Sequence, residues 1–103
     1  MRNVTVADVA KDELRLITEY LSTFGRSTAE SFALEYDRKR QLLAEGTVEF
    51  PAARHPELAR MGYRVALVKN YLMLYRVTGP DEVLIAHVLH QSQDYAKLVL
   101  DAL

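Results

Sequence analysis

Three strand-like runs follow one another closely in the second half of the chain, and they constrain the fold more than any other feature. They cover residues 62–69, 71–77 and 82–90, and they are rich in aromatic and β-branched residues. Asn70 alone separates the first two runs, and residues 78–81 separate the second from the third. Because a parallel crossover needs about a dozen residues or more, the runs are expected to pair as antiparallel hairpins.

The N-terminal residues predict a short strand followed by an amphipathic helix. Residues 3–7 are strand-like, and a helix is expected from about Val9 to Phe24, where apolar side chains recur every three or four residues. Gly25 comes directly after them. A glycine at this place suits the left-handed residue that commonly follows a helix, so the first helix is expected to end there.

A second helix is predicted immediately afterwards. Ser27, with Glu30 three residues later, has the pattern of a capping box, in which the two side chains satisfy backbone N–H groups at a helix start. Gly46 is expected to close this helix. Because only two or three residues join the two helices, they should pack as an antiparallel hairpin that needs an apolar surface to cover.

The remaining segments complete a single domain of the α+β class. Residues 46–61 contain one glycine and two prolines and are expected to be irregular. The end of the chain, from residue 92 or 93 to residue 103, is expected to be helical. The predicted order over residues 1–103 is β-α-α-β-β-β-α. In this arrangement a helical hairpin packs on one face of a small, mostly antiparallel twisted sheet, and the other face stays partly open.

The composition of the chain excludes several kinds of site. The sequence has no cysteine, which excludes disulfides and thiolate metal ligands. No stretch approaches the roughly 18–20 apolar residues of a membrane span, and the N-terminus lacks the apolar core of a signal peptide, so a cytoplasmic protein is expected. His87 and His90 have opposite parity in their strand, so a two-histidine metal site is not expected. No cofactor is expected either.

The charge of the chain is unevenly distributed. The net charge is only −1, but residues 54–76 carry five Lys and Arg against one Glu, whereas residues 77–103 carry one Lys against four acidic residues. Positive charge gathered in one stretch can form a local anion-binding surface on a nearly neutral protein. The alternative is a set of solvated charges along strand edges.

The order and text of these elements resemble the RelE/ParE toxins of type II toxin–antitoxin systems. The resemblance covers nearly the whole chain and has no single strict motif. The segments that carry it are Asp12–Leu21, Gly25–Phe32, Gly62–Arg64, Tyr71–Val77 and Val83–Tyr95.

The resemblance implies a cytoplasmic growth-inhibiting toxin of the kind that stabilises plasmids, held inactive by a cognate antitoxin in a hetero-oligomer. It leaves two targets open, since ParE-like members poison DNA gyrase and RelE-like members cleave messenger RNA on the ribosome. A third alternative is an inactive binding module that only pairs with a neighbouring protein. In each case a segment of the partner is expected on the open sheet face or beside the helices, as an added strand or as a helix in a groove.

The RelE-like alternative would be a metal-independent endoribonuclease, and it defines the candidate catalytic residues. Such cleavage needs a base, an acid and positive charge around the transition state. Arg64, Arg76, His90 and Tyr95 are the candidates, with His90 as the best acid or base because its ordinary pKa lies near neutrality. The chain departs from the RelE-like pattern at Leu72, where an arginine is common, and Arg76 could replace that cation from the same strand parity.

Two features of the chain's end favour the ParE-like alternative. Leu89-His90 with Asp94 four residues after the histidine resembles ParE-like members, and the acidic last third suits a protein surface better than RNA. His90 could then be a structural residue that caps its strand or bonds to Asp94, and Tyr95 could be an aromatic that packs the last helix onto the sheet. The sequence therefore favours a ParE-like toxin, with the ribonuclease as the alternative.

Overall fold

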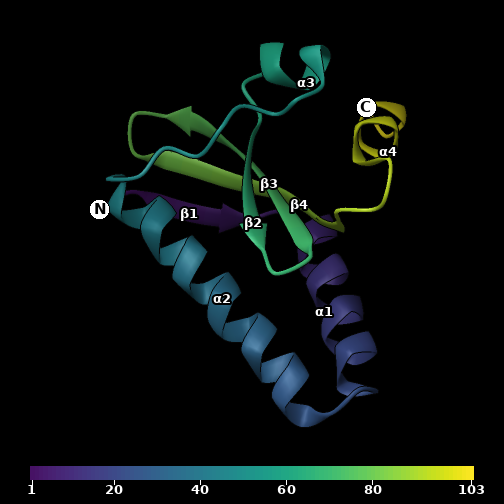
Figure 1. Ribbon diagram of the computed structural model, residues 1–103. Helices are drawn as coiled ribbons and strands as arrows, with labels where there is room; N and C mark the ends of the chain where they lie inside the picture. Colours follow the sequence, from purple (N-terminus) through teal and green to yellow (C-terminus); the bar gives the residue numbers. More distant parts are fainter.

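The computed structural model describes every residue from Met1 to Leu103 and contains four strands and four helices (Figure 1). In chain order these are β1 (Asn3–Val6), α1 (Asp8–Ser22), α2 (Arg26–Glu45), α3 (Pro56–Arg60), β2 (Arg64–Val68), β3 (Tyr71–Gly79), β4 (Glu82–His90) and α4 (Tyr95–Asp101). The predicted α+β class and order of elements are confirmed, with one additional short helix, α3, before the hairpin strands.

The strands form one mixed sheet with the order β1-β4-β3-β2. β2 pairs with β3 and β3 pairs with β4, both antiparallel, as the short connections require. β1 runs parallel to β4, with Val4 opposite Val83. The sheet is therefore antiparallel except at its N-terminal strand, and β1 and β2 are its outer strands.

The helices α1 and α2 form the predicted antiparallel hairpin and cover one face of the sheet, which we call the hairpin face (Figure 1). Phe32 and Leu43 of α2 and Ala10 of α1 pack there against Met73 and Ile85 of the sheet. All five side chains are buried almost completely. Burying one large aliphatic or aromatic side chain contributes about 1.5–3 kcal/mol, so this layer forms the main core of the domain.

The opposite face of the sheet, which we call the groove face, has a second and smaller core. Leu74 of β3 and Ala86 of β4 lie there, together with Leu58 of α3 and Val99 of α4. The predicted open face is thus covered in part by the two short helices. The parts of it near β2 remain accessible, since Leu67 is 52% exposed.

The prediction that residues 46–61 are irregular is wrong for residues 56–60. Pro56 begins α3 rather than breaking a regular element, because the first position of a helix needs no backbone N–H and suits the fixed φ of proline. His55 caps the helix, and its Nδ1 accepts the N–H of Glu57 at 3.3 Å.

The junction between α1 and α2 also differs from the prediction. Gly25 has φ 132° and ψ 154°, so it is not the left-handed residue expected after a helix, and it precedes α2 as its N-cap. No side chain caps α2, so the predicted capping box of Ser27 and Glu30 does not form. Glu30 instead pairs with Arg26, whose Nε lies 2.8 Å from its carboxylate. Gly46 closes α2 as predicted, with a left-handed φ of 71°.

Candidate functional site

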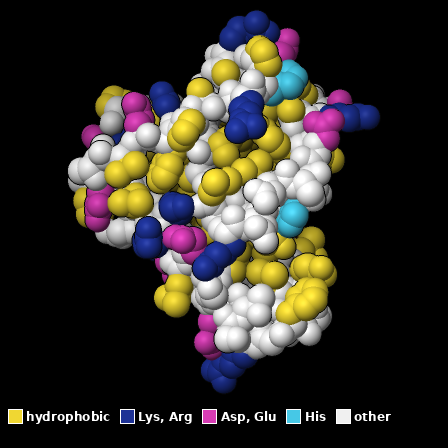
Figure 2. Space-filling view, in the orientation of Figure 1, with side chains coloured by type: hydrophobic (Ala, Val, Ile, Leu, Met, Phe, Trp, Pro, Cys, Tyr) yellow, Lys and Arg dark blue, Asp and Glu magenta, His cyan; other side chains and the backbone are white.

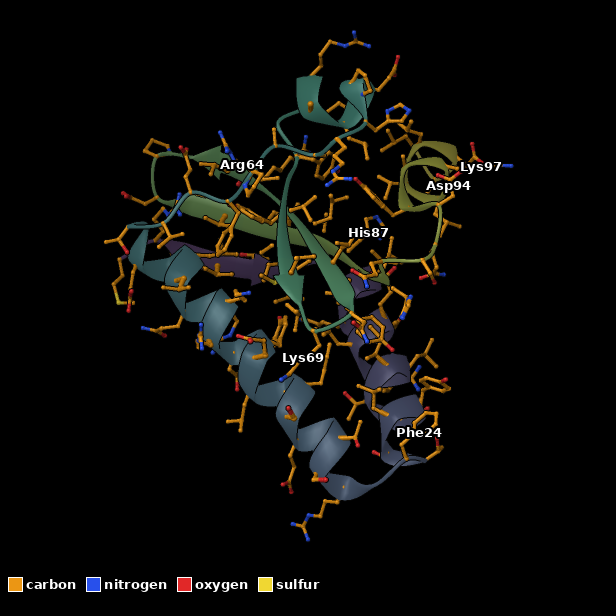
Figure 3. All side chains as sticks on the ribbon, in the orientation of Figure 1. Phe24, Arg64, Lys69, His87, Asp94 and Lys97 are labelled. Carbon is orange, nitrogen blue, oxygen red and sulfur yellow. The ribbon has the colours of Figure 1, made fainter.

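Arg64 ties the segment before β2 to the sheet. It lies opposite Tyr75 on the hairpin face, at the start of β2 (Figure 3). Its Nη1 donates to the carbonyl of Phe50 at 2.7 Å, and its Nη2 lies 3.6 Å from the carboxylate of Glu49. The guanidinium is therefore already engaged by two groups of one loop.

Tyr75 also holds the segment before β2 against the sheet, through Phe50. Its hydroxyl accepts the N–H of Phe50 at 3.2 Å, and the two rings meet edge to face with centroids 6.2 Å apart. Burial raises the pKa of the Tyr75 hydroxyl above its ordinary 10.0, while the bond from Phe50 and the charge of Arg64 lower it in part. The arrangement fixes the loop and leaves the tyrosine neutral.

Arg76 lies on the other side of the sheet. It is one residue after Tyr75 in β3 and therefore shares the groove face with Leu74. Its guanidinium carbon lies 5.2 Å from the centre of the Tyr63 ring, a cation–π contact. No carboxylate pairs with it, and its Nε is buried without a hydrogen-bond partner.

His90 is bonded within the turn that follows β4. The ring Nδ1 lies 2.7 Å from Ser92 Oγ and accepts the backbone N–H of Ser92 at 3.1 Å. The backbone N–H of His90 donates to the side-chain oxygen of Gln93 at 2.9 Å. Its ring stands edge to face against Tyr71 at 5.1 Å. Asp94 makes no bond to the histidine, because its carboxylate caps α4 by accepting the N–H of Lys97 at 3.2 Å.

The structure does not bring the four predicted catalytic residues together. Arg64 and His90 share the hairpin face but lie opposite Tyr75 and Tyr71, four positions apart along β3, which corresponds to about 13 Å. Arg76 and Tyr95 lie on the groove face, where Tyr95 packs at the edge of the second core. Their catalytic roles stay a prediction, and no two of the four are hydrogen-bonded to each other.

Sequence reasoning missed an ionisable pair beside β4. Glu13 of α1 lies with one carboxylate oxygen 3.2 Å from His87 Nδ1, while the other accepts the N–H of Val88 at 2.9 Å. The two side chains are only 19% and 17% exposed. A signal for this was present, because Glu13 falls three residues after Ala10 and four before Ile17, on the apolar side of an amphipathic helix.

A groove of about 590 Å³ runs from the outer edge of β2 onto the groove face. Its apolar lining comes from Phe50, Val65, Leu67, Leu72 and Tyr95, together with Pro51 and Ala52, and its polar lining is Lys39, Arg54 and Gln91. Figure 2 shows hydrophobic side chains gathered below α3 and beside α4, with Lys and Arg side chains next to them. No Asp or Glu lines the groove, so its charged side chains are the cations Lys39 and Arg54 alone.

A second accessible apolar surface runs along the second half of α1 and onto Phe24, two residues after the helix ends. Leu16, Tyr20 and Phe24 are 56%, 57% and 65% exposed, and their spacing of four residues places them in one stripe. Phe24 lies at the far end of the helical hairpin (Figure 3), and its ring contacts that of Tyr20 edge to face at 5.2 Å. We call these three residues the α1 stripe. Its flanking cation Arg15 is paired with Glu19 at 3.1 Å, so the stripe is electrostatically neutral.

No group of three His, Asp or Glu side chains is placed to hold a metal ion. None of the helices combines the length and the apolar character that crossing a membrane would require.

Together, the helical hairpin, the sheet order and the short C-terminal helix define a RelE/ParE-like fold. The model of the family described as "ParE toxin of type II toxin-antitoxin system, parDE" matches residues 4–95. The chain therefore belongs to the ParE toxin family, whose members work with a cognate antitoxin. No individually curated protein matches the sequence.

A solved structure described as "Chromosomal ParDE TA system from P. aeruginosa" has the same fold. It superposes with a TM-score of 0.68 at 16% sequence identity, over 87% of this chain and 96% of the other. At this identity the likeness concerns the fold alone. The family assignment comes from the family model, and the structural match agrees with it.

Proposed function

We propose that this toxin inhibits growth by binding a protein target, with DNA gyrase as the target that its family implies, and that it does not cleave RNA. The observation that carries the proposal is the separation of the candidate catalytic residues. Arg64 and His90 lie at opposite ends of the hairpin face, whereas Arg76 and Tyr95 lie on the groove face. An acid, a base and a stabilising cation must all reach one phosphate, and these residues have no common point.

The partners of the two hairpin-face candidates support the same proposal. Arg64 is engaged by the Phe50 carbonyl and Glu49, and His90 Nδ1 is engaged by Ser92. Both residues thus hold loops in place. Arg64 would have to break its bonds before it could act on a substrate, whereas the Nε2 of His90 has no hydrogen-bond partner and stays available.

The α1 stripe supplies a surface that suits a protein target. Its three exposed apolar side chains are flanked by Arg15, a cation that already pairs with the carboxylate of Glu19. RNA contacts depend mainly on Lys and Arg that neutralise phosphates, and Arg15 is already paired. Exposed aromatic side chains are instead enriched at protein interfaces.

The toxin is proposed to work in the cytoplasm, where DNA gyrase and the ribosome are found, and to be stored there as a hetero-oligomer with its antitoxin. The test compares four proteins for growth inhibition on induction and for inhibition of supercoiling by purified gyrase. These are the wild type, a stripe variant with Tyr20→Ser and Phe24→Ser, His90→Ala, and the control Leu98→Ser, which changes an exposed leucine of α4.

The wild type, His90→Ala and Leu98→Ser are expected to arrest growth and to inhibit supercoiling, whereas the stripe variant is expected to lose both activities. Mapping of message 5′ ends after induction is run alongside. New cleavage sites within translated codons that disappear in His90→Ala would establish the ribonuclease alternative and refute the proposal. A wild type without any growth defect would favour the inactive binding module.

A further inference from the structure

A second cavity lies between the helical hairpin and the turn that joins β2 to β3, and it shares no lining residue with the groove. Its volume is about 540 Å³, and we call it the turn pocket. Figure 3 shows Lys69 at this turn, beside α2. The polar residues of the lining come from the first two turns of α2 and from the β2–β3 turn: Ser27, Thr28, Ser31, Lys69, Asn70 and Tyr71. No Asp or Glu lines the pocket, so Lys69 is its only charged side chain.

The α2 hydroxyls in the turn pocket make no hydrogen bonds within their own helix. On α1, by contrast, Thr18 and Ser22 each donate to the carbonyl four residues earlier, both at 2.8 Å. Ser31 has an equivalent carbonyl in Ser27, yet neither of these two side chains nor that of Thr28 is hydrogen-bonded to the protein. Three hydroxyl groups therefore line the pocket with their donors unused.

Tyr71 forms the buried wall of the turn pocket. The residue is only 7% exposed, and its ring packs edge to face against Phe32 at 5.2 Å and against His90 at 5.1 Å. Its hydroxyl has no hydrogen-bond partner in the protein and is not enclosed by it, although a polar group at such a buried position normally has a partner. Burial raises the pKa of the Tyr71 hydroxyl above its ordinary 10.0, so the group stays protonated and can donate. An unpaired donor in the wall of a cavity points to a ligand that supplies the acceptor.

The charge and the donors of the turn pocket define the class of ligand. Lys69 has no carboxylate partner, unlike Lys11 and Arg15 of α1, and the side-chain amide of Asn70 is also free to donate. A single cation among several neutral donors suits a phosphate monoester, whose three terminal oxygens accept several hydrogen bonds at once. A carboxylate offers only two oxygens and leaves more of these donors unused.

The size of the turn pocket and its apolar lining indicate a small organic ester. The volume falls within the range of about 300–1,000 Å³ that is usual for small-molecule sites, and it exceeds what a phosphate group alone needs. Leu21 and Phe32 supply an apolar wall for an organic group. The backbone of DNA or RNA is a poorer occupant, because it is bound by rows of Lys and Arg, whereas Arg26 beside the pocket is already paired with Glu30 at 2.8 Å.

We propose that the turn pocket is a binding site for a small phosphate monoester. The ammonium group of Lys69 pairs with the phosphate, the hydroxyls of Ser27, Ser31 and Tyr71 donate to its oxygens, and the organic part of the ligand lies against the apolar wall. The site goes beyond the function proposed above, since nothing in it depends on the target of the toxin.

The test titrates isotope-labelled toxin with inorganic phosphate and with phenyl phosphate at constant ionic strength, and follows the backbone amides by nuclear magnetic resonance. Saturable shifts are expected at Ser31, Asn70 and Tyr71, with a Kd of about 1 mM or lower for the ester, the scale that a ligand of this size can reach. Phenyl phosphate is expected to bind about fivefold more tightly than inorganic phosphate, because its ring covers apolar surface. Shifts that never saturate, or that sodium chloride reproduces, would overturn the proposal, and equal affinities for the two probes would overturn the assignment to an ester.

The charge is tested with Lys69→Asn against Lys97→Gln, which removes an unpaired cation of α4 outside the pocket (Figure 3). Asparagine suits the left-handed φ of 57° at position 69, so the turn is expected to keep its conformation. Lys69→Asn is expected to weaken binding of phenyl phosphate about tenfold, and Lys97→Gln less than about twofold. Equal losses in the two variants would show a long-range attraction and refute a site at the turn.

The hydroxyls of α2 are tested with a double variant, Ser27→Ala with Ser31→Ala. Alanine is the strongest helix former, so α2 is expected to remain folded while binding weakens about fivefold or more. The matched control is Thr18→Ala with Ser22→Ala, which removes two hydroxyls of α1 that are already hydrogen-bonded and lie outside the pocket. The control is expected to bind phenyl phosphate like the wild type, and a control that lost as much affinity as the α2 variant would contradict the proposal.

The buried wall is tested with Tyr71→Phe, which keeps the packed ring and removes only the hydroxyl. Binding is expected to weaken about fivefold, the scale of one neutral hydrogen bond, while Tyr63→Phe, at a buried tyrosine outside the pocket, leaves the affinity unchanged. A short DNA duplex serves as the last probe. If the duplex displaced phenyl phosphate and lost its own binding in Lys69→Asn, the ligand would be a nucleic-acid backbone and the assignment to a small monoester would be wrong. All of these measurements use binding alone, so their outcome is independent of whether gyrase is the target.

Discussion

Glu13 carries a testable share of the stability of the domain because it closes an edge of the sheet. β1 ends at Val6, opposite Ile85, so the later part of β4 has no strand on that side. Glu13 takes that place, with one carboxylate oxygen accepting the N–H of Val88 at 2.9 Å and the other lying 3.2 Å from His87 Nδ1. One side chain thus joins α1 to the outer edge of β4.

The contacts of the Glu13 side chain determine how far its removal is expected to lower the free energy of unfolding. A hydrogen bond to a charged group contributes about 1.5–3 kcal/mol, so Glu13→Ala is expected to lower the free energy of unfolding by about 2–3 kcal/mol. Glu13→Gln keeps an acceptor for the Val88 N–H and is expected to cost about 1 kcal/mol. The control Glu19→Ala removes an exposed pair with Arg15 and is expected to cost less than about 0.5 kcal/mol.

Urea unfolding followed by circular dichroism measures these differences at neutral pH. His87→Ala and the double variant with Glu13→Ala complete a thermodynamic cycle, and a coupling energy of about 1 kcal/mol is expected for the two neighbouring side chains. If Glu13→Ala costs no more than Glu19→Ala, the carboxylate does not close the edge of β4 and the reasoning from the hydrogen bonds fails.

Three further predictions concern the core, the turns and the alkaline limit of stability. Leu58→Ala is expected to cost about 2–5 kcal/mol in urea unfolding, because this fully buried side chain anchors α3 on the groove face. Gly46→Ala is expected to cost about 1 kcal/mol more than Gly62→Ala: both glycines have positive φ, but only at Gly46 would a Cβ meet another side chain, 3.1 Å from Arg2 Nε. Burial raises the pKa of Tyr75, so unfolded chains lose this proton first, and the free energy of unfolding is expected to fall as the pH rises above about 10, less steeply in Tyr75→Phe.

The sheet could be predicted because the decisive interactions are local in the chain. A one-residue break and a four-residue break between strand-like runs permit only antiparallel hairpins, and the third run forms β4 with the predicted bounds of Glu82 and His90. The start of α2 could not be predicted in the same way. Ser27 and Glu30 match a capping box, but Glu30 pairs with Arg26, and the N-cap is Gly25, two residues before Ser27.

The positions of the candidate site residues depended on register, which local sequence does not determine. Arg64 and Arg76 are both strand cations in the sequence, yet their opposite parities put them on opposite faces of the sheet. The Glu13–His87 pair joins residues 74 positions apart, so only the packing of α1 against β4 brings them together. Resemblance to a family could suggest which residues form a site, but only the register of the folded sheet determines the distances between them.

The register of the sheet shows that Leu72 and Pro51 both shape the groove beside β2. The resemblance to RelE-like members leads to the expectation of an arginine at Leu72, whereas Pro51 is expected only to interrupt regular structure. In the fold, Pro51 ends the pairing that would otherwise cover β2, and Leu72 forms the floor of the groove that opens beside the uncovered residue Leu67. Leucine at position 72 makes the lining of the groove apolar, and the charged residues of the lining are the cations Lys39 and Arg54. Such a lining is suited to a protein surface and unsuited to the backbone of RNA, which presents phosphates without apolar side chains.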